Sequence, residues 1–212
     1  MKNIKRILIK IVILFLPLLF FSCSSDITLE LQEDGKIKIT YSGNFASDFT
    51  KNLLLQNNFE QEDFQNEDVQ LDEQSLKESL EKSGFSNIIF LSNNLEKLCI
   101  QMEDKNLQSS FFNTGLIEID KNTIKTNFSS ENLKIFYNSA DEELQMNLDL
   151  LIAPVFNDEQ MPVEEYIEMI STFYGEQIAE EIKNCKLQIT TIDSKGKNVI
   201  SLGIPELLCG MY

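Results

Sequence analysis

Histidine is absent from this 212-residue chain. A chain without histidine lacks the commonest general base, the one side chain that ordinarily changes charge near neutral pH, and the commonest ligand of zinc and other transition metals. Ser-His-Asp and Cys-His mechanisms therefore cannot be built from this chain alone. We predict no catalytic residues and no metal site.

Glycine and tryptophan are also scarce, with 8 glycines and no tryptophan. Neither of the glycine-rich loops that hold nucleotide phosphates, G-x-x-x-x-G-K and G-x-G-x-x-G, occurs in the sequence. We therefore predict no cofactor. The 15 phenylalanines, together with leucine and isoleucine, must supply most of the hydrophobic core.

Positive charge is the third shortage, since 18 basic residues stand against 34 acidic ones and the net charge is −16. Four of the basic residues lie within the first ten positions, so 14 remain in the rest of the chain and its net charge is about −20. Phosphate backbones repel such a surface, which argues against nucleic-acid binding. The excess charge indicates either simple solubility or a protein partner with a basic surface.

The N-terminus has the layout of a secretory signal. Met1 to Lys10 is basic, and Ile11 to Phe21 is an apolar run interrupted only by Pro17. Eleven helical residues span about 16 Å at 1.5 Å per residue, whereas the hydrocarbon core of a bilayer is about 30 Å thick. A basic start followed by a short apolar run indicates a segment that is cleaved after export.

The residues that end this segment, Leu19-Phe20-Phe21-Ser22-Cys23, resemble the lipobox of bacterial lipoproteins. The resemblance implies cleavage between Ser22 and Cys23 and a diacylglycerol joined to the Cys23 thiol. Phe20 and Phe21 depart from the smaller or aliphatic residues usual at those two positions. An ordinary signal cut near Ser22 or Ser24, or an uncleaved anchor, are the alternatives.

The expected organisation follows from this boundary: residues 1–22 are a cleaved signal, residues 23–26 are a lipidated anchor and short tether, and residues 27–212 form one domain. The implied location is the bacterial cell envelope, with the domain outside the cytoplasm and held to a membrane through lipid on Cys23. Two or three acyl chains hold firmly where one is marginal.

Three further cysteines follow Cys23, at positions 99, 185 and 209. Exported proteins retain disulfides, but three thiols allow one internal pair at most. A Cys185–Cys209 bridge is conceivable, but a turn near Gly196 would place Cys185 opposite residue 206 or 207, so the two sulfurs would miss each other by one or two positions. The alternative is three buried thiols that behave as small apolar side chains.

Alternating apolar residues and turn signals predict several antiparallel hairpins and strands. The expected hairpins are Ile27–Leu31 with Lys36–Tyr41 around Asp34-Gly35, Leu116–Ile119 with Thr123–Phe128, and Lys186–Ile192 with Asn198–Ile204. Further strands are expected at Asn87–Leu91, which should be buried, at Leu98 to Met102, at Leu133–Tyr137 and at Leu144–Ile152. Strict alternation favours the last of these, although the composition of Ala140 to Leu151 also suits a helix.

Helices are expected at Ala46–Asn57, at Glu73–Ser83 with Asp72 as a cap and Gly84 as a stop, and at Pro162–Asn184. Asn58 to Gln70 is polar and acidic and is expected to be a solvated loop. The last helix carries one apolar stripe, and Gly175 could kink it. Together these elements predict an α+β domain with a mostly antiparallel sheet and a long C-terminal helix packed on one face.

Acidic pairs on that last helix are the strongest candidates for chemistry. Glu164 and Glu168, and likewise Glu176 and Glu180, are four residues apart and share a helix face. Paired carboxylates serve in acid–base hydrolysis or bind cations. A solvated polar face opposite the apolar stripe explains the same pattern.

Our leading hypothesis is a lipid-anchored envelope protein with a non-enzymatic binding or structural role. A second hypothesis is a carrier that holds a small molecule or lipid in an apolar pocket. A third is an envelope hydrolase that uses carboxylates.

Overall fold

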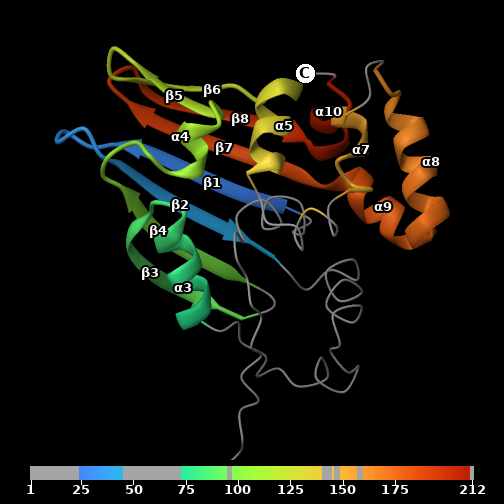
Figure 1. Cartoon of the computed structure of the whole chain (residues 1–212), viewed down its shortest axis with the longest axis horizontal. Coiled ribbons are helices and arrows are strands. Elements are labelled where there is room, and N and C mark those ends of the chain that lie inside the picture. Colours follow the sequence, from blue (N-terminus) through green and yellow to red (C-terminus); the bar gives the residue numbers. More distant parts are fainter. Residues whose placement is uncertain are drawn as a thin grey trace, which may run out of the picture.

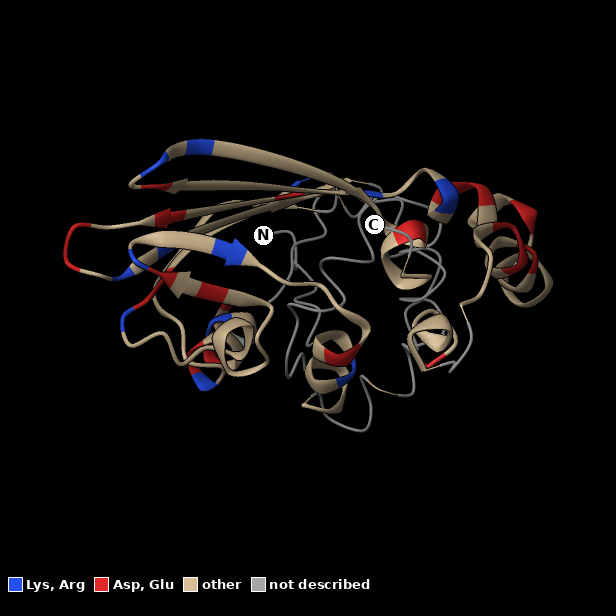
Figure 2. Cartoon of the chain, turned by 90° about the horizontal axis from the view of Figure 1, so that it is seen from above, with Lys and Arg blue, Asp and Glu red and all other residues tan. Residues whose placement is uncertain are grey.

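A six-stranded sheet with helices on one face forms the frame of the molecule (Figures 1 and 2). The computed structural model describes residues 24–44, 73–94, 97–139, 145, 149–156 and 160–210. The predicted α+β class with a mostly antiparallel sheet is confirmed. The helix predicted over residues 46–57 and the loop over 58–70 lie outside the described residues.

The sheet has the strand order β3-β4-β2-β1-β7-β8. Its strands are β1 (Ser24–Leu31), β2 (Ile37–Gly43), β3 (Ser86–Asn93), β4 (Leu98–Asp104), β7 (Lys186–Asp193) and β8 (Gly196–Gly203). Neighbouring strands run antiparallel except for β1 and β7, which are parallel. A separate hairpin consists of β5 (Ile117–Asp120) and β6 (Thr123–Thr126).

The helices of the described residues are short. They are α3 (Glu73–Lys82), α4 (Ser110–Asn113), α5 (Ser130–Asn138), α7 (Ala153–Phe156), α8 (Val163–Tyr174), α9 (Glu176–Asn184) and α10 (Ile204–Leu208). In Figure 2, α3 and α5 lie below the sheet, while α8 and α9 lie at one end of it.

The β1–β2 hairpin confirms the clearest of the predictions. Ile27 pairs with Tyr41 and Leu29 with Ile39, and these four apolar side chains are buried. Gly35 has φ +83°, which an L-residue rarely adopts and which the tight reversal requires. The alternation of apolar and polar residues therefore places one face of each strand in the core.

An aromatic cluster joins the helices that cover the sheet. Phe85 follows α3, Phe111 lies in α4, and Phe136 lies in α5. The ring centroids of Phe85 and Phe111 are 5.9 Å apart in an edge-to-face arrangement, and those of Phe111 and Phe136 are 6.1 Å apart. All three rings are buried, so they hold three elements of the covering layer together.

The strand predicted over Leu133–Tyr137 is wrong, because this segment lies in helix α5. Ser129 caps the helix: its hydroxyl accepts a hydrogen bond from the Asn132 amide at 3.3 Å. Leu133, Phe136 and Tyr137 are buried at a spacing of three and four residues, which is the helical period. The segment was too short for its composition to reveal that period.

The strand predicted over Leu144–Ile152 is also wrong in the residues that the structure describes. Gln145 is helical, and Asp149–Ile152 form turns before α7. Leu151 and Ile152 are both buried although they are consecutive, which a strand with one face in solvent does not allow.

The long C-terminal helix is the third wrong prediction, because it is broken into α8 and α9 at Gly175. This glycine has φ +92° and ψ 161°, and the chain turns there (Figure 1). Ile170, Ile178 and Ile182 are still buried, so the apolar stripe is kept across the break. The two helices pack against each other and against α10 rather than across the face of the sheet.

Strand β3 was expected to be buried but is an edge strand. Ile89 is 49% exposed and Leu91 is 59% exposed. Its pairing with β4 shifts register between Ser86 and Ile89 and again between Phe90 and Ser92. Such irregularities are typical of sheet edges, where they interfere with pairing to a further strand.

The turn from α3 into β3 depends on Gly84, which has φ +95°. A Cβ atom at this position would lie 3.1 Å from both the Gln108 carbonyl oxygen and the Ser109 Cα. Gly196 in the β7–β8 turn has φ +107°, but no atom lies within 4 Å of the point that a Cβ would occupy there. A side chain at Gly84 would therefore meet both backbone strain and crowding, whereas a side chain at Gly196 would meet backbone strain alone.

We expect Gly84→Ala to lower the free energy of unfolding by about 2–4 kcal/mol, because it adds a steric clash to the strained dihedral. Gly196→Ala should cost only about 1–2 kcal/mol, from the dihedral alone. Urea unfolding followed by circular dichroism measures both. Equal losses in the two variants would contradict the role of crowding at Gly84.

A buried carboxylate organises the loop that follows β4. Asp104 is 0% exposed, and its carboxylate accepts hydrogen bonds from the amides of Asn106, Gln108 and Ser109 at 3.1, 3.2 and 2.7 Å. The neighbouring Ser109 hydroxyl is buried without a hydrogen-bond partner. The Asp104 carboxylate therefore stabilises the loop through three hydrogen bonds, whereas the Ser109 hydroxyl contributes none.

We expect Asp104→Ala to reduce the free energy of unfolding by about 2–4 kcal/mol, since it leaves three backbone amides without their acceptor. Ser109→Ala is the matched control and should be neutral or slightly stabilising, because it removes an unsatisfied hydroxyl. Both are measured by chemical denaturation. An Asp104→Ala protein as stable as the Ser109→Ala protein would refute this account of the loop.

Candidate functional site: the start of β1 and the open face of the sheet

The described part of the chain begins within the sheet, at the residue after Cys23. Strand β1 begins at Ser24, which pairs with Lys186 of β7, and Ser25 pairs with Gly43 of β2. Ser25 is buried, so this part of the chain is integral to the sheet. Residues 24–26, expected to belong to a tether, are strand. Ser22 and Cys23 lie outside the described residues.

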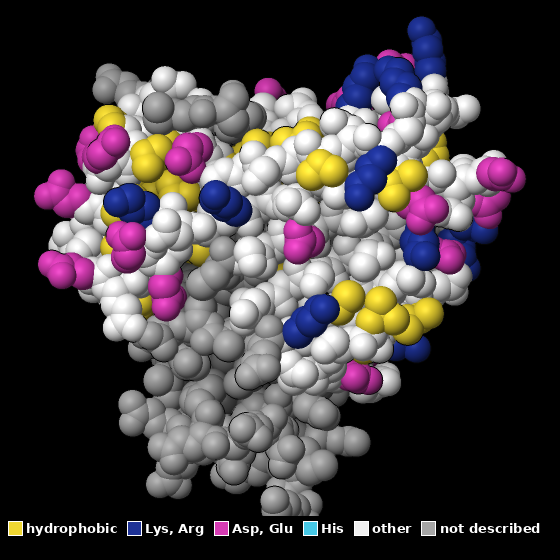
Figure 3. Space-filling view, turned by 180° about the vertical axis from the view of Figure 1, so that it is seen from behind, with side chains coloured by type: hydrophobic (Ala, Val, Ile, Leu, Met, Phe, Trp, Pro, Cys, Tyr) yellow, Lys and Arg dark blue, Asp and Glu magenta, His cyan; other side chains and the backbone are white. Residues whose placement is uncertain are grey.

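One face of the sheet is not covered by any helix that the structure describes. We call it the open face and define it by the strand side chains that alternate with the core-facing ones; Thr190, in its middle, is itself buried. These are Ile89 and Ser92 of β3; Cys99, Gln101 and Glu103 of β4; Lys38, Thr40 and Ser42 of β2; Asp26, Thr28 and Glu30 of β1; Lys186, Gln188, Thr190 and Ile192 of β7; and Lys197, Val199 and Ser201 of β8. Figure 3 looks onto this face.

The open face carries no net charge, although the chain has a net charge of −16. Its acidic members are Asp26, Glu30 and Glu103, and its basic members are Lys38, Lys186 and Lys197. Across its middle, one row of paired residues is entirely uncharged: Ile89, Gln101, Thr40, Thr28, Thr190 and Val199. Depletion of charge at the centre of a surface is typical of protein interfaces.

Apolar side chains lie at the two edges of this face. Ile89 and Leu91 are exposed on β3, and Val199 of β8 is 49% exposed. Hydrophobic side chains accordingly gather at the lower right of Figure 3, over β3. The open face as a unit was not predicted from the sequence, although the uncharged Thr, Ser and Gln at alternate strand positions were a visible signal.

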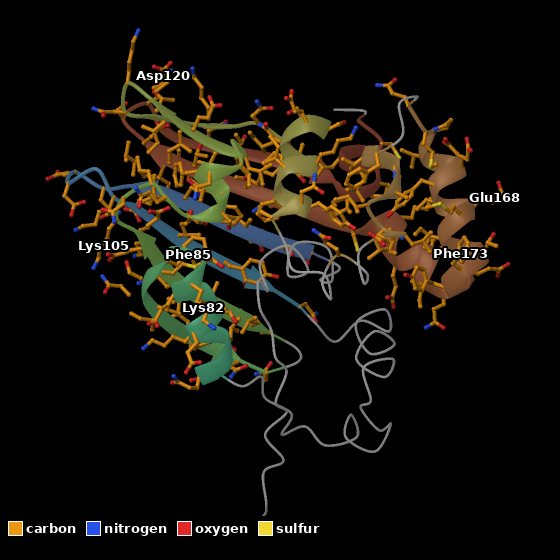
Figure 4. All side chains as sticks on the ribbon, in the orientation of Figure 1. Lys82, Phe85, Lys105, Asp120, Glu168 and Phe173 are labelled. Atoms are coloured by element: carbon orange, nitrogen blue, oxygen red, sulfur yellow. The ribbon has the colours of Figure 1, made fainter. Side chains whose placement is uncertain are left out.

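Within the described part of the chain, acidic side chains gather on α8 and α9 (Figure 2). Glu164, Glu168, Glu176 and Glu180 are all exposed. Figure 4 shows Glu168 pointing away from the sheet, as does Phe173, which is 67% exposed. The break at Gly175 places the two predicted carboxylate pairs on different helices, so they do not share one continuous helix face.

The partners of these carboxylates are those of an ordinary surface. Glu180 accepts a hydrogen bond from the Asn184 amide group at 2.9 Å, and the Lys183 ammonium lies 3.9 Å from its other oxygen. Exposed pairs of this kind contribute little energy. Within the described ranges, no three or more Asp, Glu or Cys side chains are grouped to hold a metal ion.

Cys185 and Cys209 are buried near Tyr166 of α8, and no disulfide links the three cysteines that the structure describes. Cys185 lies opposite Ile204, whose amide donates to the Cys185 carbonyl at 3.0 Å, rather than opposite residue 206 or 207 as expected. The reason is the two-residue turn between Asp193 and Gly196, which is tighter than the predicted one.

Burial raises the pKa of Cys209 to about 11, and the nearby carboxylates of Glu206 and Glu164 act in the same direction. Burial also raises the pKa of Tyr166, whose hydroxyl donates a hydrogen bond to the Leu151 carbonyl at 3.0 Å. A thiol with such a pKa is protonated at neutral pH and is a poor nucleophile. The cluster is therefore part of the core rather than a reactive centre.

No family model, curated protein or solved structure matches this chain.

None of the helices in the described part of the chain is long and apolar enough to cross a membrane.

We expect the protein to lose stability as the pH rises through about 9 to 12. Cys209 and Tyr137 have pKa values raised to about 11 and about 12, mainly by burial, with a contact between Tyr137 and Asp149 adding to the second. In this range the unfolded chain releases protons that the folded chain retains, so the free energy of unfolding falls. Urea unfolding at a series of pH values measures the decline.

Tyr137→Phe is the control for this decline. It removes one of the groups that titrate, so the loss of stability between pH 10 and 12 should be shallower than in the unmodified protein. An identical slope in both proteins would show that Tyr137 does not contribute to the pH dependence.

Proposed function

We propose that this chain is a lipid-anchored protein of the bacterial cell envelope with a non-enzymatic binding or structural role. Its signal, residues 1–22, is removed after export. Lipid on Cys23 then holds the domain to a membrane, outside the cytoplasm.

The observation that carries this proposal is that Ser24, the residue after Cys23, lies in β1, a central strand. Cleavage between Ser22 and Cys23 would therefore leave the whole described strand in the mature chain. Ser25 is buried and pairs with Gly43 of β2 and Leu187 of β7, so removal of the predicted leader leaves these contacts of the sheet intact.

A second consequence is mechanical. An anchor on Cys23 would be followed directly by a strand that is hydrogen-bonded on both sides. No flexible linker would then separate the lipid from the folded domain. Such a domain presents its surfaces at a fixed height above the membrane. This arrangement suits the display of a binding surface or a structural contact better than it suits a carrier that must leave the membrane.

The distribution of charge supports binding rather than catalysis. The exposed carboxylates of α8 and α9 form an acidic surface that a protein with a basic surface would complement. Long-range attraction of this kind mainly accelerates encounter. The open face is neutral and offers a second, short-range surface.

We expect Cys23→Ala to abolish acylation and to leave a precursor that retains its 22-residue leader. The matched control is Cys99→Ala, which removes a thiol from the folded domain and should leave acylation and processing unchanged. Labelling with a fatty acid and mass spectrometry of the N-terminal peptide measure both. Native protein with an unmodified Cys23 still joined to Ser22 would contradict the proposal.

The same material separates the proposed role from the carrier hypothesis. Native mass spectrometry of the acylated protein should give the mass of the protein and its covalent lipid alone. A stoichiometric non-covalent lipid or small molecule in the spectrum would favour the carrier.

A further inference from the structure

We propose that the open face is a homodimer interface, on which a second copy of this chain stacks face to face. The two-fold axis runs parallel to the strands and passes between β1 and β2, the two central strands of the sheet. Only the common orientation of the two lipid anchors rests on the proposed function.

The arrangement follows from the register of the strands. A rotation of 180° about this axis reverses the order of the strands across the sheet. It leaves each residue at the same height along the strand direction. Strand β2 of one copy therefore faces β1 of the other, β4 faces β7, and β3 faces β8. The residues that face each other are then read directly from the pairing of the sheet.

Charges near the axis are complementary in this arrangement. Lys38 of β2 pairs with Glu30 of β1 within one chain, so rotation places Lys38 opposite Glu30 of the second copy and Glu30 opposite its Lys38. The result is a ring of alternating charges on the axis. Glu103 faces Ile192 of the second copy, so no like charge opposes it.

The uncharged row is complementary as well. The exposed Ile89 at one edge faces the exposed Val199 at the other edge of the second copy, and Thr40 faces Thr28. Apolar side chains that are otherwise exposed at both edges thus cover each other. Burial of apolar area supplies most of the favourable free energy of such an association.

The size of the face suits a stable dimer. Six strands about 4.8 Å apart span about 29 Å, and seven residues at about 3.3 Å span about 23 Å. Each copy therefore contributes about 670 Å² in projection, and more when the side chains are included. A specific interface typically buries about 800 Å² on each side.

Charge elsewhere on the molecule argues for this face over others. Two copies of a chain with a net charge of −16 repel each other, and contact through α8 and α9 would bring acidic surfaces together. The neutral open face avoids this cost. Lys186 approaches Lys97 of the second copy only at the end of the strands, where both are exposed and salt screens them.

The axis also suits a membrane anchor. Because it runs parallel to the strands, it places Ser24 of both copies at the same end of the dimer, and β1 lies next to it. Both lipids would then enter one membrane.

Reversal of the axial charges tests the interface. We expect the full chain as isolated from cells, in mild detergent, to sediment at twice the monomer mass at tens of micromolar, with the detergent density-matched. Lys38→Glu and Glu30→Lys should each weaken dimerisation at least about tenfold, because each reversal affects both symmetric pairs. The double variant Lys38→Glu/Glu30→Lys restores opposite charges and should return the Kd to within about threefold.

Lys77→Glu is the matched control, since it makes the same charge change at an exposed position on α3, on the covered side of the sheet. It should leave the Kd unchanged. A monomeric unmodified protein, a dimer insensitive to Lys38→Glu, or a double variant that stays monomeric would each overturn the proposal.

A second measurement needs no variant and so does not depend on the variants folding. Zero-length amine–carboxyl crosslinking of a mixture of ¹⁴N- and ¹⁵N-labelled protein should join Lys38 to Glu30 in peptides of mixed isotope. Crosslinks of a single isotope alone would place this pair within one chain and would overturn the interface. Because neither assay reads acylation, dimerisation can succeed or fail independently of the proposed anchor.

Discussion

The pairing of β1 with strands on both of its sides is the constraint on which the rest of the structure depends. On one side it forms the local hairpin with β2, and on the other it lies parallel to β7. The second contact joins the first strand of the described chain to a hairpin near its C-terminus. Without it, β7 and β8 would be a separate two-stranded ribbon, which is marginally stable in water.

This central position of β1 bears on the proposed anchor. A chain attached through Cys23 would be held by an interior strand rather than by a flexible end. The covering helices lie on one side of that strand, joined by the Phe85, Phe111 and Phe136 rings, and the other side is open. The sheet therefore has a buried face that provides stability and an open face that is available for contact.

The sequence predicted the local hairpins well, because a period of two and a tight turn are visible within a dozen residues. It failed where tertiary packing overrides a local pattern. Leu133–Tyr137 is helical because a serine cap and the aromatic cluster stabilise a helix there. Gly175 was visible as a possible kink, but the continuous apolar stripe predicted one helix, and only the packing of α8 and α9 against each other and against α10 shows the full break. The acidic helix pairs were visible from sequence, whereas the open face was not.

By itself, the sequence determined the strong acidity, the lack of histidine and the hairpins around Asp34-Gly35 and Gly196, and it predicts a leader over residues 1–22. These are properties of composition or of neighbouring residues. Only the tertiary structure decided that β1 and β7 pair in parallel, that β3 is an edge, and that six polar strand faces combine into one neutral surface. Alternation shows that a strand has two different faces, but which strands lie side by side depends on contacts between distant residues.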